Sequence, residues 1–519
     1  MGMMNGQVDD PPLIHTAIER HAARTPDAIA LVDGQERVGY AELDAAANAY
    51  ADALRDRGVG PGCFVPVILP RSSTLVTALL AILKCGAAYA VLDPAWPNRR
   101  ITSLIDVLNP PVTIAETPHG HPSALWRPSV KPPSGSAQRP PDQVAYTLNG
   151  SAPAAVFFTS GTGGRPKAVV SSHRAGTRLF RGKFAPFQVG PVMPQAAPVS
   201  WDGFTLEAWG PLLTGGTSVL VRDGYLLPDT LRALIARDGV DTVWLTASLF
   251  HLFVDESPGC FTGLRQVLTG GERLSVARVR DFLTLHPDIE LINGYGPAES
   301  CVFATAHRVK RRDCDLPSGI PLGRPVPGTG VRVMSGPRPT ATGTVGEICV
   351  VGDGLALAYL GDPELTARKF PTVTLDGKPV RMYLTGDQGF MDQDGLLHFV
   401  GRLDRQVKIR GHRVEPEEVE DAARRVSGVR ECAVVPVAGE DGGHERLALF
   451  YTSPDSDAGG PRDVTPRALR RALKSTLPRH LVPELVLRRT RLPVTAHGKL
   501  DRASLLAELD RTHIPKGDQ

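Results

Sequence analysis

The sequence predicts an α/β protein made of several structural units, and three features of the chain point to this fold class. Its 519 residues are enough for about three or four units of about 150 residues each. The first hundred residues alternate between short apolar runs and longer segments of helical spacing, which is typical of a largely parallel sheet. After residue 337 the pattern changes to turns and short strands. We therefore expect a large N-terminal region of two α/β subdomains plus a β-rich subdomain, followed by a small α+β C-terminal domain.

The elements of the first hundred residues follow from their periodicity. Apolar runs of about five residues have the length of buried strands, and apolar residues at i, i+3, i+4 and i+7 indicate one buried helix face. Serines just before such a face are suitable N-caps. The predicted elements are strands at 28–32, 65–69 and 88–92, and helices at 40–57 and from Ser72 or Ser73 to Lys84.

The remaining chain continues this pattern with two interruptions. Residues 117–142 are rich in Pro, Ser and Gly and predict a surface connection. The α/β pattern resumes at 156 and continues to about 333, after which residues 337–346 are rich in turn formers. The later predicted elements are strands at 347–351, 396–400, 406–409, 431–437 and 447–451, a helix at 416–425, and a last helix with Thr465 as N-cap and Pro466 at its first position.

Composition excludes several classes of function. The chain has 58 Lys and Arg against 55 Asp and Glu, a net charge of +3, which argues against a general nucleic-acid or membrane-surface binder. The 7 cysteines form no C-x-x-C pair, so zinc ribbons and redox motifs are not expected. There is no apolar leader and no apolar run near the roughly 20 residues that span a bilayer. We therefore expect a cytoplasmic protein with reduced thiols and no membrane partner.

One glycine-rich segment, TSGTGGRPK at 159–167, carries the sharpest chemical signal. It follows an apolar strand at 154–158, and its small residues let backbone N–H groups approach an anion while the lysine adds a donor. The spacing is not that of a Walker A loop. Taken alone, such a loop is more often a plain turn, but its place after the strand favours phosphate. The candidate nucleotide-binding residues here are Thr159, Ser160, Gly161, Thr162, Gly163, Gly164 and Lys167.

Further segments remove most of this ambiguity. They lie at 38–43, 83–94, 159–167, 293–299, 346–348 with 363–366, 383–387, 401–415, 477–483 and 497–502. Through these nine motifs, which follow one another in the family's order, the chain resembles adenylate-forming enzymes. The resemblance is strongest to the amino-acid-activating adenylation domains of nonribosomal peptide synthetases. Each motif alone is weak evidence, whereas the ordered set is strong.

This resemblance implies an ATP- and Mg²⁺-dependent ligase. The carboxylate of a small-molecule acid attacks the α-phosphate of ATP, pyrophosphate leaves, and an acyl-adenylate remains for transfer to the phosphopantetheine thiol of a carrier protein. The implied organisation is an N-terminal adenylation core (1–402), a hinge (403–406) and a small, mobile C-terminal domain (407–519). Asp404 matches the hinge position. Gly411 matches the glycine beside the acceptor channel, where a side chain would obstruct the thiol arm.

Individual roles follow from the same motifs. Lys499 matches the lysine that faces the carboxylate and the α-phosphate, where a cation neutralises charge that develops in the transition state. Glu299 matches the glutamate associated with Mg²⁺, a hard ion that prefers oxygen ligands. Lys408, within the eighth motif, is counted with them as catalytic. The implied nucleotide contacts are Asp387 on the ribose hydroxyls, Arg402 on ribose or phosphate, and Tyr295 against the adenine.

Trp201 and Asp202 resemble the aromatic–Asp pair that opens the family's fourth motif. The aspartate pairs with the α-ammonium of an amino acid in that family, and a buried carboxylate needs such a cation. The positions that set specificity map to Asp202, Gly203, Leu206, Leu245, Leu268, Gly270, Gly294, Val302, Phe303 and Lys499. Apart from the two charges these are apolar or glycine, so we expect an apolar substrate side chain. The glycines predict room for branched aliphatic and for aromatic groups alike.

The acceptor in the second step is left open by the sequence. Gly163, Ala168, Ala298 and His497 depart from common family residues and are compatible with a divergent branch. No carrier or condensation domain flanks the motifs, so we expect a free-standing enzyme that loads a separate carrier protein. The alternatives are an amide bond synthetase that passes the acyl group to a free amine and, less favoured, an acyl-CoA ligase or a non-catalytic regulator. An MbtH-like activator protein is a further partner that the resemblance suggests.

Overall fold

The computed structural model describes residues 13–118, 120–128, 148–161, 166–180, 187, 190–222, 225–439, 444–453, 464–494 and 500–511. The chain forms two compact units. The first unit comprises Met1–Pro94, Ile105–Phe158 and Ala168–Leu403, and the second comprises Ala95–Leu104, Thr159–Lys167 and Asp404–Gln519. Within the described segments, every helix is too short or too polar to cross a membrane.

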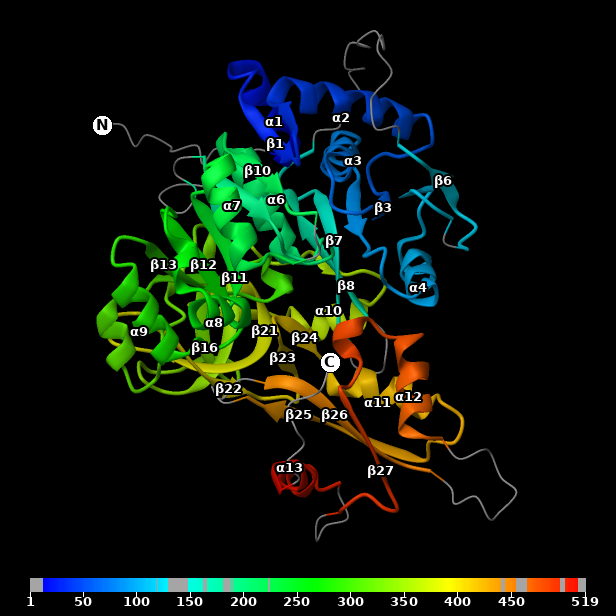
Figure 1. Ribbon diagram of the computed structural model, residues 1–519, viewed down its shortest axis with the longest axis vertical. Coiled ribbons are helices and arrows are strands. Elements are labelled where there is room, and N and C mark those ends of the chain that lie inside the picture. The colour runs from blue at the N-terminus through cyan, green and yellow to red at the C-terminus, as the bar shows by residue number, and fades with distance from the viewer. Residues whose placement is uncertain are drawn as a thin grey trace. The chain divides into compact units, whose positions relative to one another are not determined.

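A seven-stranded sheet of order β19-β8-β7-β4-β3-β5-β6 begins the first unit. The pairs within β7-β4-β3-β5-β6 are parallel, as the alternating pattern predicts. Helices α1 (Ile14–Arg24), α2 (Tyr40–Arg55) and α3 (Ser73–Lys84) pack on one another beside it (Figure 1). The strands are β3 (Phe64–Ile68), β4 (Ala88–Val91), β5 (Val112–Ala115), β6 (Ala124–Trp126), β7 (Pro153–Thr159), β8 (Lys167–Ser172) and β19 (Ala358–Tyr359).

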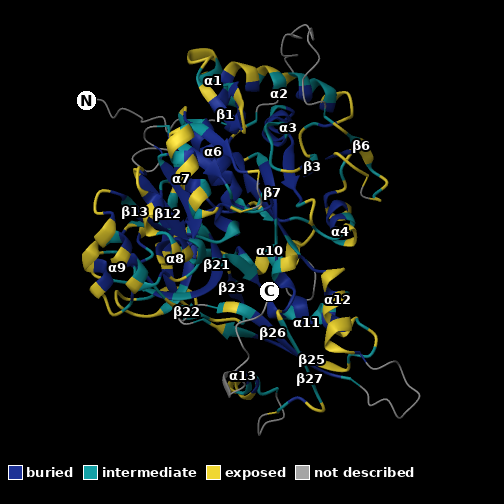
Figure 2. Cartoon of the chain, viewed as in Figure 1, coloured by how far each residue is buried: buried dark blue, intermediate teal, exposed yellow. Residues whose placement is uncertain are grey.

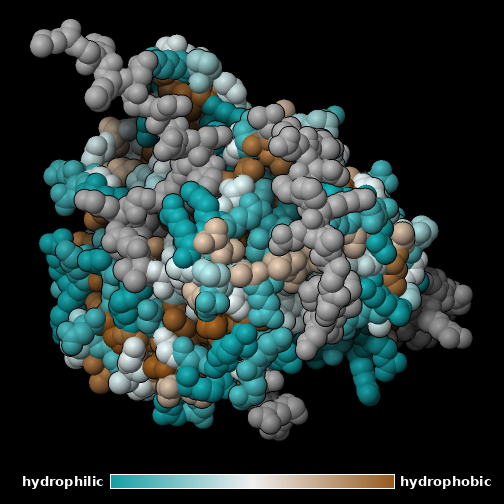
Figure 3. Space-filling view, turned by 90° about the horizontal axis from the view of Figure 1, so that it is seen from above, coloured by the Kyte–Doolittle hydropathy of each residue, from teal (hydrophilic) through white to brown (hydrophobic). Residues whose placement is uncertain are grey.

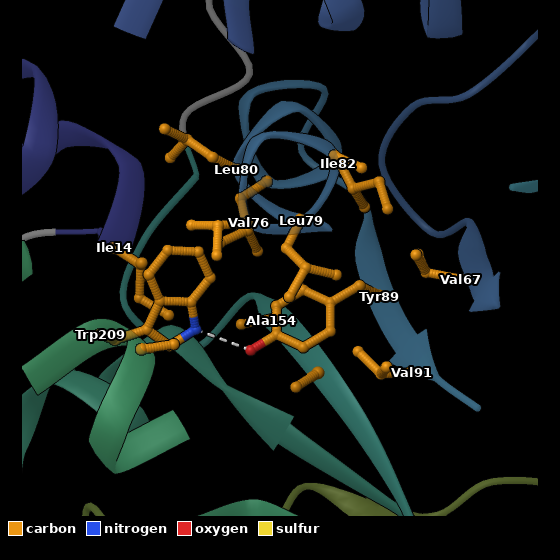
Figure 4. Close-up of a cluster of buried hydrophobic side chains, with 14 of the residues drawn as sticks. Ile14, Val67, Val76, Leu79, Leu80, Ile82, Tyr89, Val91, Ala154 and Trp209 are labelled. Carbon is orange, nitrogen blue, oxygen red and sulfur yellow. Dashed lines mark hydrogen bonds between the residues drawn. The ribbon is translucent and has the colours of Figure 1, made fainter. Parts of the chain in front are cut away.

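The core under α3 is almost entirely apolar. Figure 4 shows Val76, Leu79 and Ile82 of α3 facing Tyr89 of β4, and Trp209 entering from α6 (Asp202–Thr214). Each of these side chains is at most 2% exposed, and burial of such a side chain contributes about 1.5–3 kcal/mol. The indole Nε1 of Trp209 donates to the hydroxyl of Tyr89 at 2.8 Å, which satisfies both polar groups inside the core.

Two further sheets form the second α/β part of the first unit. A four-stranded sheet has the order β2-β1-β10-β9 and a five-stranded sheet the order β11-β12-β13-β14-β15. The strands are β1 (Ile29–Asp33), β2 (Glu36–Gly39), β9 (Val192–Gln195), β10 (Thr217–Leu220), β11 (Thr242–Thr246), β12 (Gln266–Gly270), β13 (Glu290–Tyr295), β14 (Thr305–Arg308) and β15 (Arg324–Pro325). The associated helices are α5 (His173–Thr177), α6, α7 (Pro228–Asp238), α8 (Ala247–Glu256) and α9 (Val276–Leu285).

The rest of the first unit is β-rich, as predicted. An antiparallel sheet of order β17-β16-β18-β21-β20, with β22 also on β21, contains the long strand β21. Its strands are β16 (Thr329–Ser335), β17 (Arg338–Pro339), β18 (Gly346–Gly352), β20 (Thr372–Leu375), β21 (Lys378–Met391) and β22 (Leu397–Arg402), and α10 (Pro363–Lys369) precedes β20.

The second unit has its own sheet, of order β24-β23-β26-β25 with β27 on β26. Its described strands are β23 (Val407–Ile409), β24 (His412–Val414), β25 (Glu431–Ala438), β26 (His444–Thr452) and β27 (Leu485–Arg489). The helices are α11 (Pro416–Arg424), α12 (Pro466–Lys474) and α13 (Arg502–Arg511). Helix α4 (Asn98–Leu108) begins in the residues of this unit and ends in the first.

The predicted elements are confirmed with boundaries shifted by at most a few residues. The Ser72 hydroxyl caps α3 by accepting from the Leu75 N–H at 3.2 Å, and the Thr465 hydroxyl caps α12 in the same way. The segment 117–142 differs from a plain connection, because Ala124–Trp126 forms the edge strand β6. Residues 129–142 of that segment lie outside the described residues.

Burial follows the expected periodicities. In Figure 2 the strands β12 and β13 carry the buried colour, whereas α7 and α9 show exposed residues along one side. On the face drawn in Figure 3, small groups of hydrophobic residues lie among hydrophilic ones. Such scattered apolar exposure is ordinary for a folded chain.

A buried histidine pair predicts sensitivity of folding to acid. His15 and His173 lie with ring centroids 5.6 Å apart, and the Ile14 N–H donates to Nδ1 of His173 at 3.2 Å. Burial, together with the charges of His173 and Lys84, lowers the pKa of His15 to about 3, and burial lowers the pKa of His173 to about 4. Both rings are therefore neutral in the folded chain at pH 5, whereas an unfolded histidine with its ordinary pKa near 6.5 takes up a proton.

Because the two histidines have lower pKa values in the folded chain than in the unfolded chain, they stabilise the fold above about pH 6.5. This stabilisation is lost as the pH falls towards their folded-state pKa values. We expect each histidine to remove about 2 kcal/mol of unfolding free energy between about pH 6.5 and pH 5. Urea unfolding at the two pH values measures this loss. The variant His15→Phe should lose about 2 kcal/mol less than wild type, with His121→Gln as the control. Equal losses in wild type and His15→Phe would contradict the prediction.

Candidate active site

Tyr295, Asp387 and Arg402 come together from three strands of the first unit. Asp387 on β21 pairs in register with Arg402 on β22, and Tyr295 is the last residue of β13. The Tyr295 hydroxyl donates to Oδ2 of Asp387 at 2.6 Å, and Nη1 of Arg402 donates to Oδ1. Burial, followed by the charge of Asp387, raises the pKa of Tyr295 well above its ordinary value. The phenol therefore stays protonated and remains a donor to the carboxylate.

Glu299 is fully buried in the connection between β13 and β14. The Tyr359 hydroxyl donates to its Oε1 at 2.8 Å, and the Ala356 N–H donates to its backbone carbonyl at 2.8 Å. Its carboxylate is thus held from β19, and its backbone is held from the loop before that strand. Tyr359 has no motif signal in the sequence, and only the folded arrangement shows that it contacts Glu299.

The described part of the phosphate-loop segment is in the second unit. Among the described residues, the buried Thr159 hydroxyl has no hydrogen-bond partner, which suits a residue that binds a phosphate oxygen. The Ser160 hydroxyl donates to the Arg413 carbonyl at 2.9 Å, and Nζ of Lys167 lies 3.1 Å from Oε1 of Glu415. Thr162, Gly163, Gly164 and Lys499 lie outside the described residues.

Two further predicted residues of the second unit lie on or beside the tight turn between β23 and β24, and a third precedes β23. Lys408 lies on β23, and Gly411 lies between β23 and β24 with φ +83°. A left-handed backbone favours glycine at this position whatever its further role. Oδ1 of Asp404 accepts from the Gln406 N–H at 3.2 Å, just before the first strand of the unit.

Asp202 is the first residue of α6 and follows Trp201, the N-cap residue. Its Oδ2 accepts from the Val302 N–H at 3.0 Å, and its Oδ1 accepts from the Gly203 N–H at 3.0 Å. A carboxylate in the first turn of a helix also interacts favourably with the helix dipole. The structure therefore places Asp202 against the loop that follows Glu299.

An apolar cluster adjoins Asp202 and brings together Leu206, Leu268, Val302 and Phe303 of the predicted substrate positions. Trp244 of β11 belongs to the same cluster and lies edge-on to Phe303 with ring centroids 5.4 Å apart. The other members of this cluster are Ala175, Leu179, Phe187, Met193, Ala197, Ile292, Cys301 and Val326.

Leu245, another predicted substrate position, is not part of this cluster, in which Trp244 is the member from β11. Leu245 is 1% exposed in a separate core that packs against α8 and α9. Neighbouring residues of a strand face opposite sides of the sheet, so a register error of one residue moves a side chain to the other face. Sequence spacing alone did not fix the register on β11, because loop lengths before it vary.

Two of the three predicted glycines, Gly270 and Gly294, are packed tightly against neighbouring groups of the protein. A Cβ at Gly294 would lie 2.2 Å from the Phe303 ring, and one at Gly270 would lie 2.0 Å from the Gly294 carbonyl oxygen. A Cβ at Gly203 would contact Nε1 of Trp244 at 3.5 Å. Gly270 and Gly294 therefore let neighbouring groups of the protein approach closely.

The segment before α6 is held by two polar side chains, Glu207 and Arg71, that the sequence did not reveal. Oε2 of Glu207 accepts from the N–H groups of Ala196 and Ala197, both at 2.7 Å. Arg71 donates to the carbonyls of Ala197 and Val221. Burial raises the pKa of Glu207 to about 7. Ala197, a member of the apolar cluster, is thus held at both its N–H and its carbonyl.

Comparisons with known proteins agree with the geometry. A family model described as AMP-binding enzyme matches residues 18–360, and one described as AMP-binding enzyme C-terminal domain matches residues 418–499. Tyrocidine synthase 3 of Brevibacillus parabrevis is 34% identical over 500 residues, which are 95% of this chain and 8% of that protein. The chain spans only a small part of the length of the curated relatives that it matches.

Solved structures give the same result. Holo-PA1221, an NRPS protein containing adenylation and PCP domains bound to a vinylsulfonamide inhibitor, has a TM-score of 0.85 and 36% identity over 96% of this chain and 84% of that chain. The amide bond synthetase McbA from Marinactinospora thermotolerans has a TM-score of 0.77 over 96% of this chain and 99% of that chain, but at 24% identity it shares the fold alone. The chain therefore belongs to the AMP-binding enzyme family and is an AMP-forming, adenylate-forming ligase.

Proposed function

We propose that this chain activates an α-amino acid with a short aliphatic side chain and passes it to the phosphopantetheine thiol of a carrier protein. The observation that carries the proposal is the position of Asp202, a carboxylate next to an apolar cluster. A carboxylate in such surroundings pairs well with an α-ammonium group. The apolar cluster then receives the substrate side chain, for which it offers no charged partner.

The nucleotide contacts follow from the residues already described. Asp387 and Arg402 would hold the ribose, Tyr295 would lie along the adenine, and the Thr159 hydroxyl has the free capacity to donate to a phosphate oxygen. The buried carboxylate of Glu299 provides oxygen ligands that suit Mg²⁺. Proteins commonly bind this ion through one or two carboxylates together with substrate phosphates. When bound, Mg²⁺ would supply charge neutralisation at the phosphates. Lys499 would stabilise the charge that builds as the carboxylate attacks the α-phosphate.

The second step is proposed on the basis of the relatives. The chain shares 36% identity with a protein whose structure contains an adenylation and a PCP domain, and the segment around Gly411 matches the family's eighth motif. We propose 1–402 as the adenylation core, 403–406 as the hinge at Asp404 and 407–519 as the C-terminal domain. Rotation at Asp404 would exchange the residues that the C-terminal domain presents to the adenylate.

The side-chain preference follows from what fills the cluster. Trp244 lies beside Gly203, and the Phe303 ring covers Gly294. The remaining predicted walls are the aliphatic Leu206, Leu268 and Val302. A short aliphatic side chain matches these walls, whereas an aromatic ring would displace Trp244 or Phe303 at a cost in packing.

Hydroxylamine-trapped pyrophosphate release, with no acceptor added, tests the proposed function. The substrates are alanine, valine, isoleucine, leucine and phenylalanine, together with their des-amino analogues and a set of aryl acids. We expect turnover with short aliphatic amino acids and little with the des-amino analogues. Turnover mainly with aryl or des-amino acids would overturn the amino-acid assignment and favour an amide bond synthetase.

The role of Trp244 gives a separate prediction with a matched control. Trp244→Ala should raise the ratio of phenylalanine to valine turnover by about tenfold or more, because removing the indole opens space beside Gly203. Leu245→Ala, one residue away on the opposite face, should lower the melting temperature and leave the ratio unchanged. A changed ratio in Leu245→Ala with none in Trp244→Ala would return the pocket position to Leu245.

A further inference from the structure

The loop that carries Glu299 has an unusual backbone. Cys301 has φ +50° and Val302 has φ +66°, so two consecutive non-glycine residues are left-handed. The left-handed region is unfavourable for a β-branched residue such as valine. Such conformations persist only where the surrounding structure imposes them, and they concentrate at functional sites. Some group in the first unit must therefore hold this loop.

Arg178 holds the loop through hydrogen bonds to its backbone carbonyls. Its side chain is buried and the residue is 1% exposed. Nη2 donates to the carbonyls of Ser300 and Phe303, and Nη1 donates to the carbonyl of Cys301 at 3.2 Å. One guanidinium thus donates to backbone carbonyls of residues before and after Val302. A planar group with several fixed donors suits this task, and a lysine would not reproduce its geometry.

The guanidinium is also fixed from its other side. Nε of Arg178 donates to the Thr329 hydroxyl at 2.9 Å, and Nη1 donates to the Ala175 carbonyl. A Cβ at Gly354 would lie 2.5 Å from Nη2 and 2.6 Å from both Cζ and Nε. Glycine at 354 therefore leaves the space that the guanidinium occupies. Burial lowers the pKa of Arg178 to about 10, so the group is still charged at neutral pH.

The conformation of the loop decides what faces the substrate. With Val302 left-handed, its N–H points to Oδ2 of Asp202 at 3.0 Å, and the Phe303 ring packs over Gly294. We propose that Arg178 is a positioning residue for the substrate site, which holds residues 300–303 so that Val302 orients Asp202 and Phe303 closes the apolar cluster. The part that concerns the amino-acid substrate rests on the proposed function, and the part that concerns the loop does not.

Thiol reactivity tests the loop independently of any substrate. The probe is iodoacetamide on the full chain, with the rate at each cysteine mapped by mass spectrometry. In Arg178→Gln and Gly354→Ala we expect alkylation of Cys301 to rise by about tenfold or more, because local opening governs the reactivity of a buried thiol. Cys260 and Cys349, which are buried elsewhere, should keep their wild-type rates. Gly60→Ala, at a glycine with open space around it, is the matched control.

Kinetics then test the consequence for the substrate. Pyrophosphate release in the same variants should show a KM for the amino acid raised by about tenfold, with the KM for ATP within about twofold of wild type. Arg178→Lys should not restore the wild-type KM. Thr329→Val removes the hydrogen bond from Nε of Arg178 and should raise the KM for the amino acid by a smaller factor. If Arg178→Gln does not fold, this variant tests whether Arg178 positions the loop.

Three results would overturn the inference. Equal acceleration at Cys260, Cys301 and Cys349 would show that Arg178 supports only global stability. An unchanged rate at Cys301 would show that the loop does not depend on the guanidinium. A selective rise in the alkylation rate of Cys301 with an unchanged KM for the amino acid would show that the loop conformation does not affect substrate binding. If wild type uses a different acid, the proposed function fails, while the alkylation result still decides the loop and the KM comparison is made with that acid.

Discussion

Replacing Lys499 by alanine is expected to lower adenylate formation by about 10²–10³-fold, the usual effect of removing one preorganised donor to a developing charge. The lysine lies in the HGKLDR segment at 497–502, and we propose that it acts on the reacting carboxylate and the α-phosphate. The substitution removes the cation without changing the residues assigned to adenine and ribose. ATP binding, measured by calorimetry, should therefore persist while pyrophosphate release falls.

Lys474→Ala is the matched control, because Lys474 is an exposed lysine at the end of α12 in the same unit. It should leave both measurements unchanged. Loss of ATP binding in Lys499→Ala would mean that the residue holds the nucleotide rather than the transition state. Unchanged pyrophosphate release would remove Lys499 from the catalytic group.

The second large effect is expected for Asp202→Asn, which keeps the shape of the side chain but removes its charge. An asparagine oxygen still accepts from the Val302 N–H, so the loop retains that contact. Losing the partner of a largely desolvated ammonium group should raise the KM for the amino acid by about 10²-fold. The KM for ATP should change by about twofold or less, because the nucleotide contacts are proposed at other residues.

The des-amino analogue offers an internal comparison. It carries no ammonium group, so its low turnover should fall little further in Asp202→Asn, and the preference for the amino acid over its analogue should shrink. Asp229→Asn, at an exposed aspartate in the first turn of α7 that pairs with Arg232, controls for the loss of a carboxylate charge in the first turn of a helix. Equal rises in both KM values would assign Asp202 a structural role.

The sequence predicted the elements of the fold well because their signals are local. Ser72 and Thr465 cap their helices as expected, and the alternating pattern gave the parallel strands of the large sheet. Each of these features depends on a few neighbouring residues, whose preferences agree with the fold around them.

The candidate site was predicted less completely, for two physical reasons. Leu245 and Trp244 belong to different apolar clusters, so a list of pocket residues depends on the strand register, which a motif at a distance does not fix. The sequence did not indicate the role of Arg178, because its acceptors include backbone carbonyls of residues more than a hundred positions away. Every residue has a backbone carbonyl, so the residue types at those positions do not mark them as acceptors. An isolated arginine in a sequence is otherwise expected to be a solvated surface charge.

The stacked arrangement of Gly270, Gly294 and Phe303 also bears on attempts to redesign this enzyme. A library that randomises every position assigned to specificity would include 270 and 294, where any Cβ collides with a carbonyl oxygen or an aromatic ring. Most of its members would fold poorly before their selectivity was ever tested. A smaller library at Leu206, Trp244 and Leu268, with both glycines kept, would concentrate the search on side chains that are free to change size.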